Sequence, residues 1–328
     1  MSSSRPDEPT TQRRSGASAP DEPTMSQLTA ERAVVRVQSA TSIETKPRRD
    51  WVPYVLAAPH VLVLVAFVVL PILAIVIVSF WEFNGITMTP AFTLDNYKEI
   101  LGLAAYRATY LNTFKFAIIV WAITLSIAFP VAYFLAFEVR STRWRTALFL
   151  VCTVPFLTSN VIRSISWIPF LGRNGILNSL LLTMGLTDKP VDLFLYSEFS
   201  VILAMVHLYT LFMVTPIFNT MMRIDHALIE AARDLGANWF QIVREIVIPL
   251  STPGIMIGTI FVVTLVLGDF LTVGLMSGGQ SASVGLAIQK MITSLQYPVA
   301  AANAVILLTV TLLIVSVLVR VVDIRKEL

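Results

Sequence analysis

The chain has little charge and almost no cysteine. Only 14% of its 328 residues are charged, against about 25% in a typical soluble domain, while 55% are hydrophobic and the mean hydropathy is +0.74. A soluble protein of this size cannot bury so much apolar surface, so the composition excludes that class and predicts an integral membrane protein. The single cysteine, Cys152, excludes an intrachain disulfide, and in its apolar stretch the thiol is expected to act as a small hydrophobic residue.

Motifs of common enzyme classes are also missing. The sequence has no G-x-x-x-x-G-K-[ST] and no Gly-Lys pair, so the chain does not bind ATP through a phosphate-binding loop, and any ATP-derived energy must come from another subunit. It has no H-E-x-x-H, and three scattered histidines do not make a metal site. No basic run is interleaved with aromatics, which argues against nucleic acid as a partner. We therefore expect no catalytic residue, no metal and no cofactor.

Two other classes of membrane protein fit the sequence poorly. Intramembrane aspartyl proteases carry a Gly-Asp pair within a span, as in Gly268-Asp269, but their pattern needs a further glycine where Val266 stands and a Tyr-Asp pair that the chain lacks. Secondary transporters driven by ions often show paired internal repeats and more spans, and no such repeat is visible. Both alternatives are therefore disfavoured.

Six long apolar runs predict six membrane-spanning helices. Each is at least about as long as the ~20 residues that a helix needs to cross a bilayer, and backbone groups in lipid must be satisfied within helices. Residues 1–50, rich in Ser, Thr, Pro and charge, are expected to be a disordered cytoplasmic tail, and residues 51–328 the transmembrane domain. The expected spans are residues 54–80, 112–137, 146–170, 200–222, 251–275 and 300–319.

The distribution of Lys and Arg predicts the orientation. The segments on one side of the expected membrane hold three such residues each, whereas those on the other side hold two, two and one. The richer side is expected to face the cytoplasm, which places both termini there in a multi-pass protein of the cell membrane. The richer segments are 46–53, 138–145, 223–250 and 320–328, and the poorer ones are 81–111, 171–199 and 276–299.

Polar residues between the fourth and fifth runs predict a helix-turn-helix across the cytoplasmic face. Asp225 is a suitable N-cap and Gly236 a suitable left-handed stop, so residues 226–235 are expected to form a short helix. Asn238 can cap a second helix that runs to Pro249, where the proline either ends the helix or starts the next element.

The spacing within this segment resembles the EAA loop of permease subunits in bacterial ABC importers. Glu230-Ala231-Ala232 is followed by three residues, Gly236, nine residues, Ile246, one residue and Ile248-Pro249, with Ile248 where leucine is usual. The resemblance implies a coupling helix that docks in a groove of a separate ATPase subunit. An ordinary capped helix pair is the alternative, and the complete spacing disfavours it. The residues assigned to ATPase coupling are Glu230, Ala231, Ala232, Asp234, Gly236, Ile246 and Pro249.

A weaker resemblance points to the spermidine/putrescine branch of these permeases. It rests on Arg163, Trp167, Gly175-Ile176-Leu177-Asn178 and Leu267-Gly268-Asp269-Phe270. It implies an all-α, type I importer-like permease domain with a second permease subunit, two ATPase subunits and an extracytoplasmic binding protein as partners. The substrate it implies is a polyamine. Permeases for a sugar, an amino-acid derivative or an oxyanion remain as alternatives.

Ionisable and aromatic residues in the outer halves of the expected spans are candidates for a translocation path. Charges in hydrocarbon usually face a cavity or a partner. Asp269 would meet an ammonium group and Trp167 would offer a cation–π face, whereas an anionic substrate would be bound by Arg163. The alternative is a structural layer, with Arg163 and Asp269 as a buried ion pair. The candidates are Arg163, Trp167, His207, Tyr209, Asp269 and Thr272, of which the ionisable Arg163, His207 and Asp269 are expected to face the bundle interior.

Overall fold

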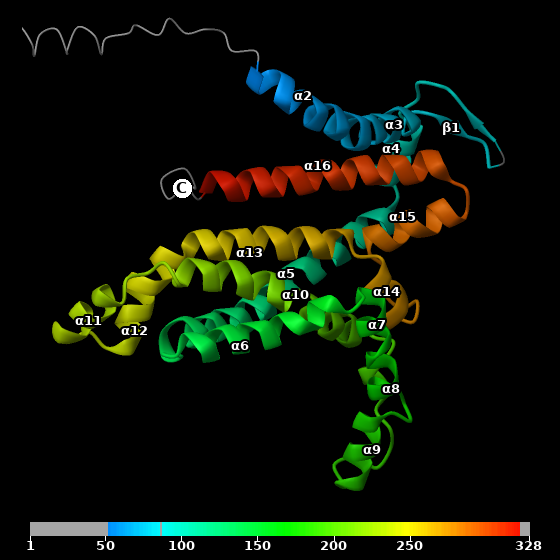
Figure 1. Ribbon diagram of the computed structural model, residues 1–328. Helices are drawn as coiled ribbons and strands as arrows, with labels where there is room; N and C mark the ends of the chain where they lie inside the picture. Colours follow the sequence, from blue (N-terminus) through cyan, green and yellow to red (C-terminus); the bar gives the residue numbers. More distant parts are fainter. Residues whose placement is uncertain (1–51, 86, 322–328) are drawn as a thin grey trace, which may run out of the picture. The chain divides into compact units, whose positions relative to one another are not determined.

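The computed structural model describes residues 52–85 and 87–321, so the tail expected over residues 1–50 lies outside the described residues. The chain divides into two units, the first ending at Leu64 and the second beginning at Val65. In the first unit, helix α2 (Val52–Leu64) is described. The second unit is built almost entirely from helices (Figure 1), which confirms the predicted all-α fold.

Five helices are long and apolar enough to cross a membrane, and a bent pair brings the number to six if it counts as one span. With the bent pair counted as one span, the number agrees with the six spans predicted from the sequence. The five are Tyr54–Val78, Ala104–Glu138, Glu198–Met221, Trp239–Gly268 and Tyr297–Arg320. Their elements are α2, η1 (Val65–Val69), α3 (Leu70–Val78), α5 (Ala104–Tyr133), η2 (Phe134–Glu138), α10 (Glu198–Met221), α12 (Trp239–Ile242), η5 (Val243–Val247), α13 (Ile248–Gly268) and α16 (Tyr297–Val321).

Two of the π-helical turns end two residues before a proline. Turn η1 precedes Pro71 and turn η5 precedes Pro249, which is the second residue of α13. A proline ring has no N–H to donate and collides with the carbonyl four residues earlier. A wider turn moves that carbonyl away, so the helix continues through the proline.

The third span departs from the straight helix expected over residues 146–170. Helix α6 (Thr142–Thr153) and the 3-10 turn η3 (Val154–Leu157) are followed by a bend of 92°. The chain is extended at Thr158 and Ser159, and the Ser159 hydroxyl then accepts a hydrogen bond from the Val161 amide and caps the next helix. Hydropathy alone missed this break because both sides of it are apolar. The elements that follow are α7 (Asn160–Ile165), α8 (Trp167–Leu171), α9 (Ile176–Thr183) and η4 (Asp192–Phe194).

The core of the second unit lies where α5, α10 and α13 pack together. Two glycines of α13 allow the close approach: a Cβ on Gly254 would lie 2.5 Å from the Pro216 carbonyl oxygen of α10, and one on Gly258 would lie 2.6 Å from Met213 Sδ. Small residues at helix contacts are typical of membrane bundles. The Trp121 indole of α5 also donates a 2.9 Å hydrogen bond to the Thr259 hydroxyl of α13.

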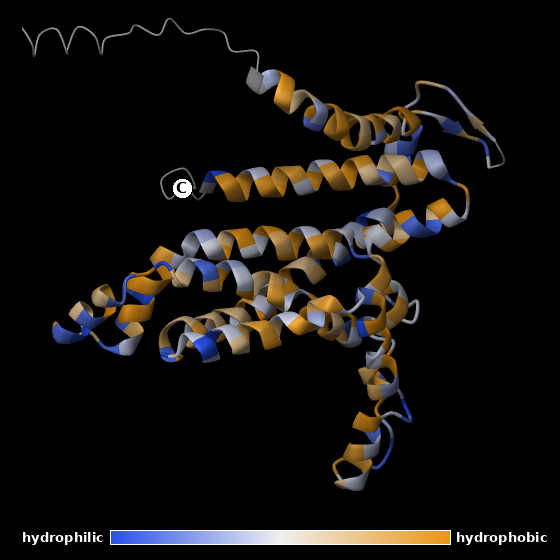
Figure 2. Ribbon diagram, viewed as in Figure 1, coloured by the Kyte–Doolittle hydropathy of each residue, from blue (hydrophilic) through white to orange (hydrophobic). Residues whose placement is uncertain are grey.

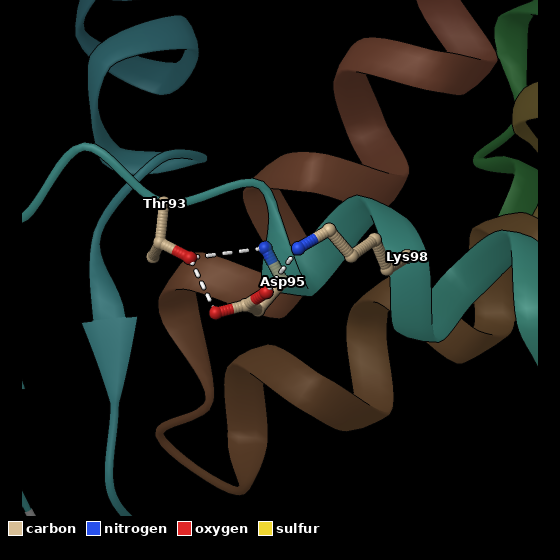
Figure 3. Close-up of polar contacts among 3 residues, drawn as sticks. All are labelled: Thr93, Asp95 and Lys98. Atoms are coloured by element: carbon tan, nitrogen blue, oxygen red, sulfur yellow. Dashed lines mark hydrogen bonds and ion pairs between the residues drawn. The ribbon is translucent and has the colours of Figure 1, made fainter.

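A polar turn starts helix α4 (Asp95–Gly102) next to a short hairpin. Strand β1 (Glu82–Phe83) pairs antiparallel with β2 (Met88–Thr89), with Glu82 opposite Thr89. Lys98 lies 2.8 Å from one Asp95 oxygen and the Thr93 hydroxyl donates to the other at 2.7 Å (Figure 3). The Lys98 hydrogen bond, followed by that of Thr93, lowers the pKa of the Asp95 carboxyl.

The two ends of the second unit's long helices carry different elements. Helices α11 (His226–Asp234) and α12 lie at one end of α13, and α14 (Leu271–Met276) follows its other end (Figure 1). The connection from α5 to α6 and the C-terminal end of α16 lie at the same end as α11 and α12. Most residues of the long helices between these ends are hydrophobic (Figure 2). Helix α15 (Val284–Thr293) lies between α14 and α16 in the sequence.

Candidate functional site

Helix α11 begins and ends where the sequence predicts. The Asp225 carboxylate accepts a 2.9 Å hydrogen bond from the Ala227 amide and caps the N-terminus. Gly236 has φ +85°, and the Gly236 and Ala237 amides donate to the carbonyls of Arg233 and Ala232, both at 2.9 Å. This left-handed turn satisfies two carbonyl groups that the helix end would otherwise leave free.

The second helix also starts as predicted but does not stop at Pro249. Asn238 and Gln241 form a reciprocal capping box, with bonds of 2.9 Å and 2.8 Å to each other's backbone amides. The helix then runs through η5 into α13, so one continuous rod of 30 residues extends from Trp239 to Gly268. The sequence left open whether Pro249 ends this helix or starts the next element, and the structure places it at the start of α13. Residues 225–247 are called the elbow below.

The residues expected to contact an ATPase subunit do not all face outwards. Glu230, Ala231, Asp234 and Gly236 are exposed, but Ala232 packs against the core of the bundle and Ile246 is half-buried. Ala232 therefore serves the attachment of α11 to the bundle rather than close approach of a partner. The exposed surface also contains large apolar side chains that the sequence pattern did not single out, namely Leu228, Leu235 and Phe240.

Aromatic side chains attach the elbow to the end of α5. The Trp239 indole N–H donates a 3.2 Å hydrogen bond to the Tyr133 hydroxyl oxygen, and their ring centroids lie 6.1 Å apart, edge to face. The His226 ring meets the Phe137 ring in the same manner at 5.6 Å. Neither Tyr133 nor Phe137 was predicted, because no local sequence signal links residues so far apart in the chain.

Asp269 lies at a break in the fifth span rather than within a straight helix to residue 275. Its backbone is extended between α13 and α14, and one carboxylate oxygen accepts a 2.9 Å hydrogen bond from the Thr272 amide at the start of α14. The other accepts a 2.7 Å bond from the Tyr209 hydroxyl. The Ser283 hydroxyl donates to the Asp269 carbonyl at 3.0 Å. The structure thus joins Tyr209, Asp269 and Thr272, all three predicted.

Arg163 and Asp269 do not form the ion pair considered from the sequence. Asp269 is occupied as described, whereas the Arg163 guanidinium donates to the Asn160 side-chain oxygen and lies 5.5 Å from the Phe156 ring centroid. Arg163 is only 8% exposed and its Nε has no hydrogen-bond partner within residues 52–85 and 87–321. No carboxylate of the described residues lies within 4 Å of this guanidinium, and burial of an unpaired cation is costly.

Trp167 and His207 form a separate pair. The Trp167 indole N–H donates to His207 Nδ1 at 3.2 Å, and the rings meet edge to face at 5.6 Å. In the single chain His207 is exposed and Trp167 half-buried. Within the single chain His207 is therefore not enclosed by the bundle, although its ring packs against Trp167, and its place on a translocation path stays a prediction.

A cavity of about 1100 Å³ lies between α6, α10 and α13 and reaches the elbow at Asp225 and Leu228. Tilted aromatic rings connect it to the polar site, because the Phe212 ring centroid lies 6.4 Å from that of Tyr209 and 4.6 Å from that of Phe156. The cavity walls are largely apolar. Its aromatic lining consists of Phe149, Phe156, Phe212 and Phe261.

Comparison with known proteins identifies the class. Residues 56–327 match the family described as binding-protein-dependent transport system inner membrane component. The chain belongs to this family. It is therefore an integral membrane component of a transport system, and the family implies an ATPase and a binding protein as the other parts of that system.

Two curated relatives of this permease cover most of its length. The spermidine/putrescine transport system permease protein PotB of Haemophilus influenzae is 31% identical over 256 residues, or 77% of this chain and 88% of the relative. PotB of Escherichia coli K12 is 34% identical over 246 residues, or 74% and 88%. The likeness to the spermidine/putrescine branch inferred from a few residues thus extends over about three quarters of the chain.

Solved structures show the same fold. A chain of a bacterial alginate ABC transporter, in complex with an alginate pentasaccharide-bound periplasmic protein, aligns with a TM-score of 0.69 and 20% identity. The alignment covers 84% of this permease and 95% of that chain. At this identity the likeness establishes the permease fold and leaves the substrate to other arguments.

Proposed function

We propose that this permease is one of two membrane subunits of an ATP-driven importer for a polyamine of the spermidine/putrescine class. The substrate assignment rests on the 31–34% identity to spermidine/putrescine permeases over most of the chain. The likeness to the alginate transporter, at 20% identity, supports only the fold and gives no argument for a polysaccharide substrate.

The polar site offers groups suited to an ammonium ion. A carboxylate has about four lone-pair sites, and Asp269 uses two of them for Tyr209 and Thr272. The remaining sites can accept hydrogen bonds from a protonated amine. The aromatic residues that follow, from Tyr209 to the cavity walls, offer π faces along which further ammonium groups can move.

The elbow is proposed to dock on an ATPase subunit. Exposed Glu230 and Asp234 stand among the exposed apolar side chains of Leu228, Leu235 and Phe240, a mixture that suits a helix lying in a groove of a partner. ATP-driven closure of two ATPase subunits would draw the elbows of two permeases together and turn the bundle from inward-open to outward-open. An extracytoplasmic binding protein would then release its cargo.

The elbow end of the helices is proposed to face the cytoplasm. The α5–α6 connection, the elbow and the C-terminal end of α16 lie at that end (Figure 1), and segments 138–145 and 223–250 carry three Lys or Arg residues each. Segments of this kind face the cytoplasm in most membrane proteins. Docking of a cytoplasmic ATPase requires the same orientation.

Uptake by the complete complex in proteoliposomes tests the substrate. Labelled spermidine should accumulate in an ATP-dependent manner, and an excess of a sugar or an oxyanion should not compete. Asp269→Asn removes the charge but still accepts from the Thr272 amide and can donate to the Tyr209 hydroxyl. It should raise the KM about tenfold or more, as expected for a lost hydrogen bond to a charged group.

Two results would count against this proposal. Uptake of a sugar or oxyanion in place of the polyamine refutes the substrate. Unchanged uptake in both Asp269→Asn and Trp167→Ala shows that these residues hold the helices together and do not touch the cargo.

A further inference from the structure

The elbow is held to the bundle by contacts of two kinds. Ile229, Ile242 and Val247 are buried against the bundle, and apolar contacts of this kind are not directional. The hydrogen bond from Trp239 to Tyr133 is directional, and the edge-to-face ring contacts have a preferred geometry. Within the described residues, this is the only hydrogen bond between two side chains that joins the elbow to another helix of the bundle.

Both partners of this bond lie shortly before a π-helical turn. Tyr133 is the last residue of α5 before η2, and Trp239 lies in α12, which leads directly into η5. The backbone hydrogen-bond ladder changes its register at each turn, and such turns inside α-helices recur at functional sites. The contact therefore joins the end of α5, where the π-helical turn begins, to the helix turn that precedes η5.

Helix α5 connects this contact to the polar site at its other end. Near the start of α5, the Thr113 hydroxyl accepts a 2.9 Å hydrogen bond from the Val284 amide, and the Asn112 side chain donates to the Ala282 carbonyl at 2.8 Å. Ser283, which lies between Ala282 and Val284 in the sequence, donates a hydrogen bond from its hydroxyl to the Asp269 carbonyl oxygen. Thr113 and Tyr133 both lie on α5, about 30 Å apart along its axis, so this part of α5 links the elbow to the segment that holds Asp269.

We propose that Tyr133 and Trp239 are positioning residues that transmit displacement of the elbow to α5, with His226 against Phe137 as a second contact. This rests on the proposed function, since an elbow transmits displacement only if an ATPase subunit moves it. When the elbow moves, the directional Trp239–Tyr133 hydrogen bond makes α5 move with it. The apolar contacts alone would allow the elbow to slide past α5.

The test is the number of substrate molecules imported per ATP hydrolysed by the complete complex in proteoliposomes. Tyr133→Phe and Trp239→Phe each remove the bond and keep an aromatic ring. Each should lower this ratio about two- to tenfold, the range expected for one hydrogen bond, while the ATPase subunit still co-purifies. The double variant should be no worse than either single one, because both remove the same interaction. Trp239→His keeps a ring N–H and should recover part of the ratio.

Tyr110→Phe is the matched control. It removes a hydroxyl from the same helix, at a site where Tyr110 contacts Asn303 and not the elbow, and it should leave the ratio unchanged. Unchanged ratios in both single variants, or additive losses in the double variant, would overturn the proposal. Measurements on the wild-type complex separate the two claims. If the wild-type complex imports no polyamine, the proposed function is refuted. If it imports polyamine and the variants behave like the wild type, only the role of the Tyr133–Trp239 hydrogen bond is refuted.

Discussion

Substitution of Gly236 separates the folding of the elbow from its docking. Gly236 has φ +85°, and a Cβ at this position would meet no heavy atom within 4 Å. The cost of any side chain in the isolated permease is therefore the backbone cost of the left-handed conformation, about 1–2 kcal/mol. Gly236→Ala and Gly236→Leu should weaken the C-terminal turn of α11 by the same amount, whereas Gly236→Asn should cost less because asparagine tolerates this conformation.

Hydrogen exchange of the α11 amides in the purified permease measures the first effect. A loss of 1–2 kcal/mol corresponds to about 5- to 30-fold faster exchange, and the values for alanine and leucine should agree. Titration with the ATPase subunit measures the second effect. In this titration the Gly236→Leu permease should bind the ATPase subunit more weakly than the Gly236→Ala permease, because the larger side chain would enter the space expected for the docked partner.

Either measurement can refute this reasoning. Different exchange rates for alanine and leucine in the isolated permease would mean that the site is not open. Equal affinities of the two variants for the ATPase subunit would mean that Gly236 lies outside the docking surface.

Three further changes test the fold around the site. Gly254→Ala should destabilise the permease by about 1–3 kcal/mol in thermal unfolding, because its Cβ would lie 2.5 Å from the Pro216 carbonyl, whereas Gly268→Ala has no atom within 4 Å and serves as the control. Asp225→Ala should lose a helix cap worth about 1 kcal/mol and speed hydrogen exchange in α11; unchanged exchange would contradict the cap. The lowered pKa of Asp95 stabilises the first turn of α4 at neutral pH, a contribution lost as the pH falls through that lowered pKa, and Asp95→Asn should remove this pH dependence of exchange in α4.

Local chemistry made the elbow predictable from the sequence. Asp225, Gly236 and Asn238 act through their own backbone neighbours, within three residues at most, so the signals that predict the caps lie side by side in the sequence. The spacing of the EAA segment then indicated the family. Its function as a docking surface stays a prediction.

The breaks in the third and fifth spans were not predicted. Hydropathy follows the membrane environment, and the longer stretches that flank Ser159 and Asp269 are predominantly apolar, so the runs looked continuous. Signals were present nonetheless, because serine and aspartate favour helix N-caps and Gly268 is a poor helix former. A preference for capping residues within long apolar runs would have located both breaks.

Contacts between distant helices were beyond sequence reasoning. The pairing of Arg163 with Asp269 was considered because opposite charges in a membrane usually meet, but Tyr209 occupies the carboxylate instead. The Tyr133–Trp239 bond joins residues 106 positions apart. Such pairs depend on how whole helices pack, and no single sequence encodes that in a local pattern.

Labelling of a cysteine placed at exposed Ala231, in a Cys152→Ser background, tests the central claim most directly. The native cysteine is removed so that the new thiol is the only one in the chain. In sealed vesicles a membrane-impermeant maleimide should react only from the cytoplasmic face, and assembly with the ATPase subunit should protect the thiol. Reaction from the outer face, or equal reaction with and without the ATPase subunit, would contradict an elbow that couples ATP hydrolysis to the helix bundle.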